Sequence, residues 1–353
     1  MRHPCSVVLS AFLATTAWAQ ESNYGPRSFL PPDYDGEMKV DVRRLDDLGV
    51  LAELLRSPLG TFAGAFQREF GFSIEDLDRV TYAFREHTRG SGDQEQSIPE
   101  RSIWVFEGGK SVDLTAEAAG GDPGTLGGVK FVERDGKEMC SPRAGLLVIE
   151  GHFGETRRHL ISSVLEGKRK GGVPRPEVLE LSGRPHLLLS VVRLVPESEA
   201  NTTRFFPGVG TDWTVETDPP AALCLRVAED PKTEGLKAEV LVRFQKGDAG
   251  PQLFGEKFKG LIASAVEMKQ MLPFKDLLTA VVIRTEGRDC VATVDFGTGR
   301  EAVGKLGKLG LMIGMWGMGS SVERVEAVQA VPAPAVPAPA TEPKREDGGD
   351  GKR

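Results

Sequence analysis

Histidine and glutamate side chains gather in one short stretch of the chain, "EGHFGETRRH" (150–159). The stretch contains Glu150, His152, Glu155 and His159. If a helix begins just before Glu155, then Glu155 and His159 lie four residues apart on one helical face, with His152 just upstream. Two imidazoles and one carboxylate are the ligand set of catalytic zinc sites that keep one position open. The stretch therefore predicts a metal site formed by His152, Glu155 and His159.

Two features of this stretch favour a simpler interpretation. Its spacing, H-x-x-E-x-x-x-H, matches neither H-E-x-x-H nor H-x-x-E-H. Arg157 and Arg158 place two positive charges beside the carboxylate, and these would repel a cation. The competing interpretation is a solvent-facing pair of Glu155 and His159 on a surface helix.

Other catalytic motifs are weak. The stretch "GREAVGKL" (299–306) follows the pattern of a phosphate-binding loop, but Leu306 stands where that loop needs a hydroxyl side chain to hold Mg²⁺. A turn followed by a helix is the favoured interpretation. The sequence contains no G-x-S-x-G, the commonest motif around the nucleophile of serine hydrolases. We therefore expect no cofactor, and the sequence alone assigns no catalytic residue.

A glycine- and methionine-rich stretch, "KLGLMIGMWGMGSS" (308–321), lies near the end of the expected fold. On a helix over 301–320, apolar side chains recur at spacings of four and three, with glycines on the adjacent face. We expect this helix to pack against the protein's own sheet. The alternative is an interface with a second copy of the chain, giving a homodimer, or with another protein. The residues of that interface would be Leu306, Leu309, Gly310, Ile313, Gly314, Trp316 and Gly317.

The same stretch is too short to span a membrane. Its uncharged run, 309–322, measures about 21 Å as a helix, whereas the hydrocarbon core of a bilayer is about 30 Å thick. We expect no transmembrane span in the mature chain.

The two ends of the chain are predicted to lie outside the fold. Residues 1–19 combine a basic start, an apolar run and an A-x-A cleavage site ending at Ala19, which is typical of a signal peptide. The protein is therefore predicted to be periplasmic or secreted, with cleavage after Ala19. Residues 20–37 are predicted to be a flexible N-terminal segment. Residues 331–353 alternate Pro and Ala and then become charged, which predicts a disordered tail.

Composition excludes some classes of partner. The formal net charge of −7 argues against nucleic acid and against anionic membrane surfaces as partners. Beyond the predicted signal peptide the chain has three cysteines, Cys140, Cys224 and Cys290, and no C-x-x-C. An odd number allows one intrachain disulfide at most. Because each cysteine lies in or beside a strand-like run, we expect buried free thiols that act as small apolar side chains.

The order of helical and strand-like patterns predicts an α+β fold. Residues 38–184 contain helical patterns, then β-rich runs, then a short helix, and residues 185–330 repeat the order of strands followed by a helix. We therefore expect two related halves from an internal duplication, each a mainly antiparallel sheet with helices packed on one face.

One resemblance follows from these patterns. The runs "IEDLDRVTYAF", "SIWVFEG" and "VKFVERDGKEMCSPRAGLLVIEG" resemble a group of uncharacterised exported proteins common in planctomycete-type bacteria. The resemblance extends over about residues 38–300 and implies a similar compartment and fold. It implies no reaction, because that group has no assigned activity.

Taken together, these patterns favour a non-enzymatic binding or envelope-associated interaction protein with an unidentified protein or envelope partner. The alternative is a periplasmic hydrolase, metal-assisted around His152, Glu155 and His159.

Overall fold

A computed structural model describes most of the 353-residue chain. The described residues are 24–56, 60–89, 96–152, 159–194, 202–204, 212–214, 218, 220–247 and 249–309. The predicted signal peptide and C-terminal tail lie outside them, as do residues 310–330.

The first half of the chain, up to helix α7, begins with a short 3-10 helix and ends with two short α-helices. Its elements are η2 (Pro26–Phe29), β1 (Gly36–Asp41), α2 (Val42–Asp47), α3 (Val50–Arg56), α4 (Gly60–Phe70), η3 (Ile74–Asp76), β2 (Leu77–Arg89), β3 (Gln96–Gly108), α5 (Ala116–Ala119), β4 (Gly124–Leu126), β5 (Val129–Arg134), β6 (Lys137–Arg143), β7 (Leu146–His152), α6 (Leu160–Leu165) and α7 (Pro176–Ser182).

The second half is built around a long helix. Its elements are β8 (Leu188–Arg193), β9 (Thr202–Arg204), β10 (Asp212–Thr214), β11 (Pro220–Glu229), β12 (Leu236–Phe244), α8 (Gly250–Glu267), η5 (Lys269–Phe274), α9 (Lys275–Thr279), β13 (Val282–Glu286), β14 (Asp289–Gly297) and a helix over 299–309.

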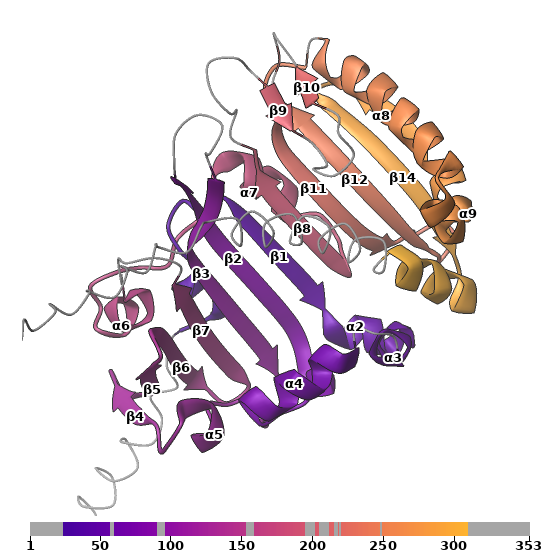
Figure 1. Ribbon diagram of the computed structural model, residues 1–353. Coiled ribbons are helices and arrows are strands. Elements are labelled where there is room, and N and C mark those ends of the chain that lie inside the picture. Colours follow the sequence, from indigo (N-terminus) through magenta and orange to yellow (C-terminus); the bar gives the residue numbers. More distant parts are fainter. Residues whose placement is uncertain are drawn as a thin grey trace, which may run out of the picture.

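Twelve strands form one continuous antiparallel sheet, in the order β13-β14-β12-β11-β8-β1-β2-β3-β7-β6-β5-β4 (Figure 1). Strands β9 and β10 pair separately. The prediction of an α+β fold with antiparallel strands is confirmed. The strands of the second half occupy one end of this strand order and those of the first half the other end. The two groups meet where β1 pairs with β8.

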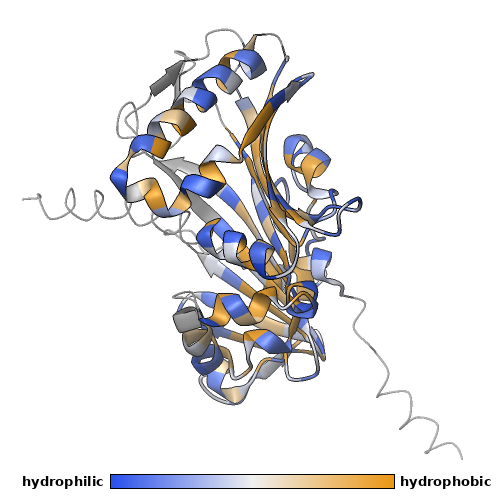
Figure 2. Ribbon diagram, turned by 90° about the vertical axis from the view of Figure 1, so that its right-hand side faces the viewer, coloured by the Kyte–Doolittle hydropathy of each residue, from blue (hydrophilic) through white to orange (hydrophobic). Residues whose placement is uncertain are grey.

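Helices cover both faces of the sheet rather than one. Strand β3 shows why, since Ile103 and Val105 belong to one buried cluster while Phe106 and the neighbouring Trp104 contact another. A strand that is apolar on both faces must be covered on both. We call the side covered by η2, α6 and α7 the α7 face, and the side covered by α2 to α5, α8, α9 and the helix over 299–309 the α4 face. Figure 2 shows apolar residues along the strands between these helices.

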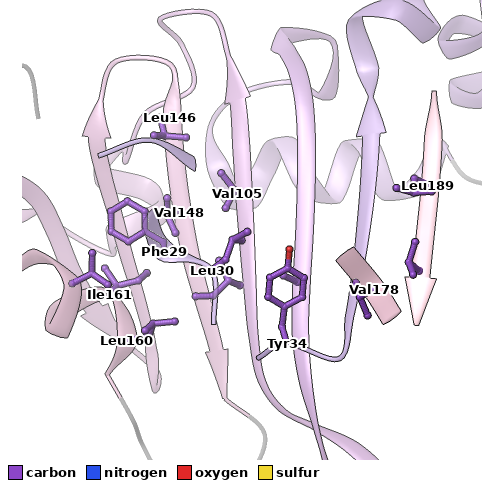
Figure 3. Packing of buried hydrophobic residues seen from close by; sticks show 14 of the residues in the cluster. Phe29, Leu30, Tyr34, Val105, Leu146, Val148, Leu160, Ile161, Val178 and Leu189 are labelled. Atoms are coloured by element: carbon purple, nitrogen blue, oxygen red, sulfur yellow. The ribbon is translucent and has the colours of Figure 1, made fainter. Parts of the chain in front are cut away.

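The core of the α7 face joins segments that are distant in the sequence. Phe29 from η2 and Leu160 and Ile161 from α6 are fully buried over Val148 of β7 (Figure 3). Burying a side chain of this size stabilises the fold by about 1.5–3 kcal/mol. This packing fixes α6 against the strands that carry the acidic groups described below.

Local sequence signals set several boundaries. Gly49, at φ 70°, separates α2 from α3. Ser73 and Asp76 form a capping box at η3, with the Ser73 amide donating to Asp76 at 2.8 Å. Asp135 and Gly136 both adopt positive φ in the β5–β6 turn, as two-residue hairpins require.

The three cysteines are buried and free, as predicted. Burial raises the pKa of the Cys224 and Cys290 thiols to about 11, so both stay protonated and unreactive at neutral pH. Within the described ranges, every helix is too short or too polar to cross a membrane.

Candidate functional site

The structure describes only two of the three residues of the predicted metal site, His152 and His159. His152 is the last residue of β7, and Glu155 lies outside the described residues. His159 is the N-cap of α6, so it precedes the helix. In the part of the chain that the structure describes, no three His, Cys, Asp or Glu side chains are grouped to hold a metal ion. The three-residue metal site stays a prediction.

His159 instead joins a network of buried carboxylates. Its Nδ1 lies 2.8 Å from Glu138 Oε1, and Glu138 is 1 % exposed. Glu138 of β6 stands directly opposite Glu150 of β7, which is 0 % exposed. Arg101 of β3 completes the network, with its Nε 3.3 Å from Glu150 Oε1. Two adjacent acids, an arginine and a histidine thus lie in one place.

These two acids hold the start of helix α6. The amides of Leu160 and Ile161 donate to Glu150 Oε2 at 2.6 and 3.1 Å, and the Ser162 amide donates to Glu138 Oε2 at 3.0 Å. The first amides of a helix have no partner within the helix, and an acceptor is required wherever they are buried. The network therefore joins α6 to the sheet.

Burial sets the protonation of this network. It raises the pKa of Glu150 to about 7, and the neighbouring Glu138 adds to the rise, while Arg101 and the two helix amides oppose it. Glu150 therefore changes charge near neutral pH. A carboxyl group of this kind suits acid–base chemistry. Here, however, it accepts hydrogen bonds from the Leu160 and Ile161 amides of α6 and so has a structural role.

Other buried acids on the α7 face also join segments of the chain. Asp35 accepts from Arg175 Nε at 2.7 Å and from Arg193 at 3.3 Å. Glu37 accepts from the Tyr34 hydroxyl at 2.8 Å. Burial, with the nearby Glu37 charge, raises the pKa of Tyr34 above its ordinary value.

A large cleft opens at one end of the sheet. It lies where β1 ends, β8 begins and β11 turns into β12, and its cavity volume is about 1160 Å³. Arg44 of helix α2 and Leu48, the C-cap of that helix, contribute to its wall. Its charged and titratable lining residues are Asp41, Arg44, His186, Arg226, Glu229, Asp230, Lys232, Glu234, Lys237 and Glu239.

Ion pairs fix the walls of the cleft. Arg44 makes a two-pronged contact with Glu229, at 3.1 and 2.7 Å, which holds α2 against the end of β11. Glu239 accepts from Arg226 at 3.1 Å and from Arg184 at 2.7 Å. Arg–carboxylate pairs of this geometry are well ordered, so the walls are set before any ligand arrives.

Four charged groups of the cleft have polar capacity to spare. Lys232, Glu234 and Lys237 make no side-chain hydrogen bond or ion pair to the described residues. The Nε of Arg226 is buried and has no hydrogen-bond partner among those residues. Glu234 also holds a φ of 55°, a conformation that costs a non-glycine residue about 1 kcal/mol. Cationic and anionic groups therefore face the cleft together.

The predicted interaction helix is only partly described. Leu306 is 8 % exposed and belongs to a buried cluster on the α4 face with Ala302, which is 2 % exposed. Leu309 packs against this cluster and against another beside α9. Gly310, Ile313, Gly314, Trp316 and Gly317 lie outside the described residues.

The phosphate-loop pattern forms a turn and a helix, as favoured above. Gly299 adopts φ 57°, and the helix over 299–309 follows. Lys305, where a phosphate-binding lysine would stand, pairs instead with Glu301 at 2.7 Å.

The network and the cleft could hardly be predicted from the sequence. Glu138 stands in "KEMC" as an ordinary strand residue, 21 positions from His159. Glu229 is 185 positions from Arg44. One sequence signal does point to buried ion pairs. Arg226 in "LCLRVA" and Glu239 in "KAEVLV" are charged residues within otherwise apolar strands, and buried charges are usually paired.

Comparisons with known proteins give no family. Neither a family model nor a curated protein matches the sequence. Six chains of solved structures match, among them crystal forms of TP0453. Form III has a TM-score of 0.45 and 9 % identity over 81 % of this chain and 99 % of that chain. Form IV has a TM-score of 0.42 and 10 % identity, covering 82 % and 98 %.

Proposed function

We propose that this chain is an exported, non-enzymatic binding protein, and that the cleft between α2 and the β11–β12 turn holds its ligand. The observation that carries the proposal is the cleft itself, with walls fixed by ion pairs and with spare groups of both charges. Groups of both signs fit a zwitterionic ligand such as a short peptide with free termini. Lys237 would take its carboxylate, and Glu234 its ammonium group.

A binding role also agrees with the buried acids. Each of Glu138, Glu150 and Asp35 accepts hydrogen bonds that attach a helix or an irregular segment to the sheet. A carboxylate whose hydrogen bonds hold the fold together in this way has a structural rather than a catalytic role. The alternative of a metal-assisted hydrolase has no observation in its favour.

Equilibrium dialysis with tri-alanine tests the proposal, with N-acetylated tri-alanine amide as the uncharged probe. Tri-alanine should bind and the capped peptide should not. Lys237→Gln should weaken binding about 10-fold, the effect of one charge-assisted hydrogen bond. Lys269→Gln, on the exposed surface of η5, is the matched control. Equal binding of both peptides would contradict the proposal, and cleavage of tri-alanine would restore the hydrolase alternative.

A further inference from the structure

Strand β13 forms one end of the twelve-stranded sheet. In Figure 1 the strand order leads through β11, β12 and β14 to this end. Strand β13 pairs with β14 on one side, and no strand among the described residues pairs with its other side. All of its residues except Ile283 are exposed, and Val282 is 61 % exposed. Such an edge offers backbone N–H and C=O groups to a further strand.

The hairpin of β13 and β14 determines which backbone groups face this open edge. Glu286 and Asp289 flank a two-residue turn and are cross-strand partners, so they exchange backbone hydrogen bonds. Because these bonds alternate along an antiparallel strand, the N–H and C=O groups of Thr285 and Ile283 point away from β14. Within the described residues, these outward groups have no backbone partner. They are free to bind a strand that arrives at the edge.

The opposite end of the sheet is protected against such pairing, whereas β13 is not. The terminal strand at that end, β4, has three residues, and very short edge strands resist extension. Strand β13 has five residues, with no proline or lysine among them, and its pairing with β14 has no bulge. Charged side chains can also deter pairing, but the charges of β13 have opposite signs, on Arg284 and Glu286.

These two charges match a second copy of the same strand. Arg284 and Glu286 lie two positions apart, so they share one face of the sheet, and they form an ion pair at 2.8 Å. An edge strand can pair with its own copy in antiparallel orientation about a two-fold axis. Each residue with outward backbone groups must then face another such residue. This rule allows registers centred on Ile283, Arg284 or Thr285.

Charge selects one of these three registers. Centring on Arg284 would place two arginines directly opposite each other, which is destabilising. Centring on Ile283 would leave Glu286 beyond the start of the other β13, at Val282. Centring on Thr285 places Arg284 of each copy opposite Glu286 of the other, so that an ion pair forms on either side of the axis. It also places the two Thr285 side chains opposite each other, and threonine pairs stabilise adjacent strands.

We infer that two copies of this chain associate through their β13 edges, in the antiparallel register centred on Thr285, and join their sheets into one. The interface uses neither the cleft nor the helix over 299–309, so it does not depend on the proposed ligand. One short strand from each copy gives a small interface, and small interfaces belong to weak, transient complexes. The dimer therefore forms and dissociates with the concentration of the chain.

Sedimentation equilibrium of the full chain tests the dimer. The mass should rise from that of one chain at about 1 µM towards that of two chains at about 100 µM, as expected for a small interface. Glu286→Arg and Arg284→Glu should each weaken self-association by about 10-fold or more, because like charges then face each other. A mixture of the two variants in equal amounts should associate about as tightly as the unaltered chain, since opposite charges meet again.

Matched controls come from another exposed ion pair, Glu53 and Arg56 of α3 in the first half. Glu53→Arg and Arg56→Glu make the same changes in net charge and should leave the dimer unchanged. Thr285→Pro is an independent variant that removes one outward N–H, and proline is tolerated on an edge strand where the N–H faces solvent. It should weaken the dimer by about 10-fold or more while circular dichroism shows an unaltered melting temperature at about 1 µM.

Several results would overturn the inference. A single-chain mass at about 100 µM would mean that the edge does not pair with its copy. A dimer of unchanged affinity in both charge variants, or in Thr285→Pro, would place the association on another surface. Failure of the mixed charge variants to associate would mean that Arg284 and Glu286 do not meet across the interface.

Discussion

Both faces of the sheet hold helices against the strands, but they do so through different kinds of contact. The α7 face buries charged groups, such as Glu37, Glu150 and Glu239, and attaches its helices through hydrogen bonds to them. The α4 face buries aromatic and aliphatic side chains, as in the Phe66–Phe106 contact between α4 and β3. Hydrogen bonds fix direction and register, whereas apolar contact is less directional. Helix α6 uses both means, because its apolar side chains are buried against the sheet while its first amides need the acids as acceptors.

This difference predicts that the α7 face is sensitive to the loss of a single charge. Arg101→Met should lower the free energy of unfolding by about 3–5 kcal/mol at pH 8, because Glu150 is left buried and charged without its partner. Urea denaturation followed by circular dichroism measures the effect. At pH 5 the loss should be smaller, since Glu150 is then protonated.

Arg284→Met provides the control, because its ion pair with Glu286 is exposed at the surface and should contribute less than about 1 kcal/mol. The double variant Arg101→Met/Glu150→Leu should recover much of the lost stability. A loss below 1 kcal/mol at pH 8 in the single variant would mean that the ion pair does not stabilise the fold.

The second prediction concerns pH and Glu150. Because the folded-state pKa is about 7, above the ordinary value of 4.5, the folded state binds the proton more tightly than the unfolded state. The stabilisation is complete below about pH 4.5 and is lost as pH rises through 7. Glu150→Gln keeps an acceptor for the helix amides. It should reduce the change in the free energy of unfolding between pH 4.5 and 8 by about 2–3 kcal/mol.

Urea midpoints between pH 4.5 and 8 measure that slope. His159→Gln serves as the comparison, since His159 touches Glu138 rather than Glu150. Parallel pH profiles for the unaltered chain and Glu150→Gln would assign the pH dependence to another group.

The smallest predicted effect is on the α4 face, where shape rather than charge matters. Gly36→Ala would place a Cβ within 2.3 Å of the Phe84 ring, so the ring must leave its stack with Tyr82. We expect a loss of about 1–2 kcal/mol. Gly260→Ala in α8, where the Cβ meets open space, should instead stabilise by up to about 1 kcal/mol. Thermal denaturation of both variants measures these effects. An unchanged melting temperature for Gly36→Ala would mean that the Phe84 ring is not held against Gly36.

Local features of the fold could be predicted from the sequence, and long-range ones could not. Asp135-Gly136 specifies its turn through backbone conformation alone, and Ser73 with Asp76 specifies a cap within four residues. The network of Glu150 and Arg101 depends instead on strand register, because one shifted residue would turn every side chain to the opposite face. The expectation of separate sheets failed for the same reason, since nothing near β1 indicates that β8 is its neighbour.

The place of β1 in the sheet has a consequence for how the chain folds. Strand β1 is synthesised before the other described strands, yet it lies between β2 and β8 near the middle of the sheet. Its second partner follows about 150 residues later, as in the pair Glu37 and Val191, and contacts so distant in sequence slow folding. Until β8 arrives, β1 presents an open edge that other chains can extend. Aggregation during synthesis is therefore a hazard that a holding chaperone would reduce.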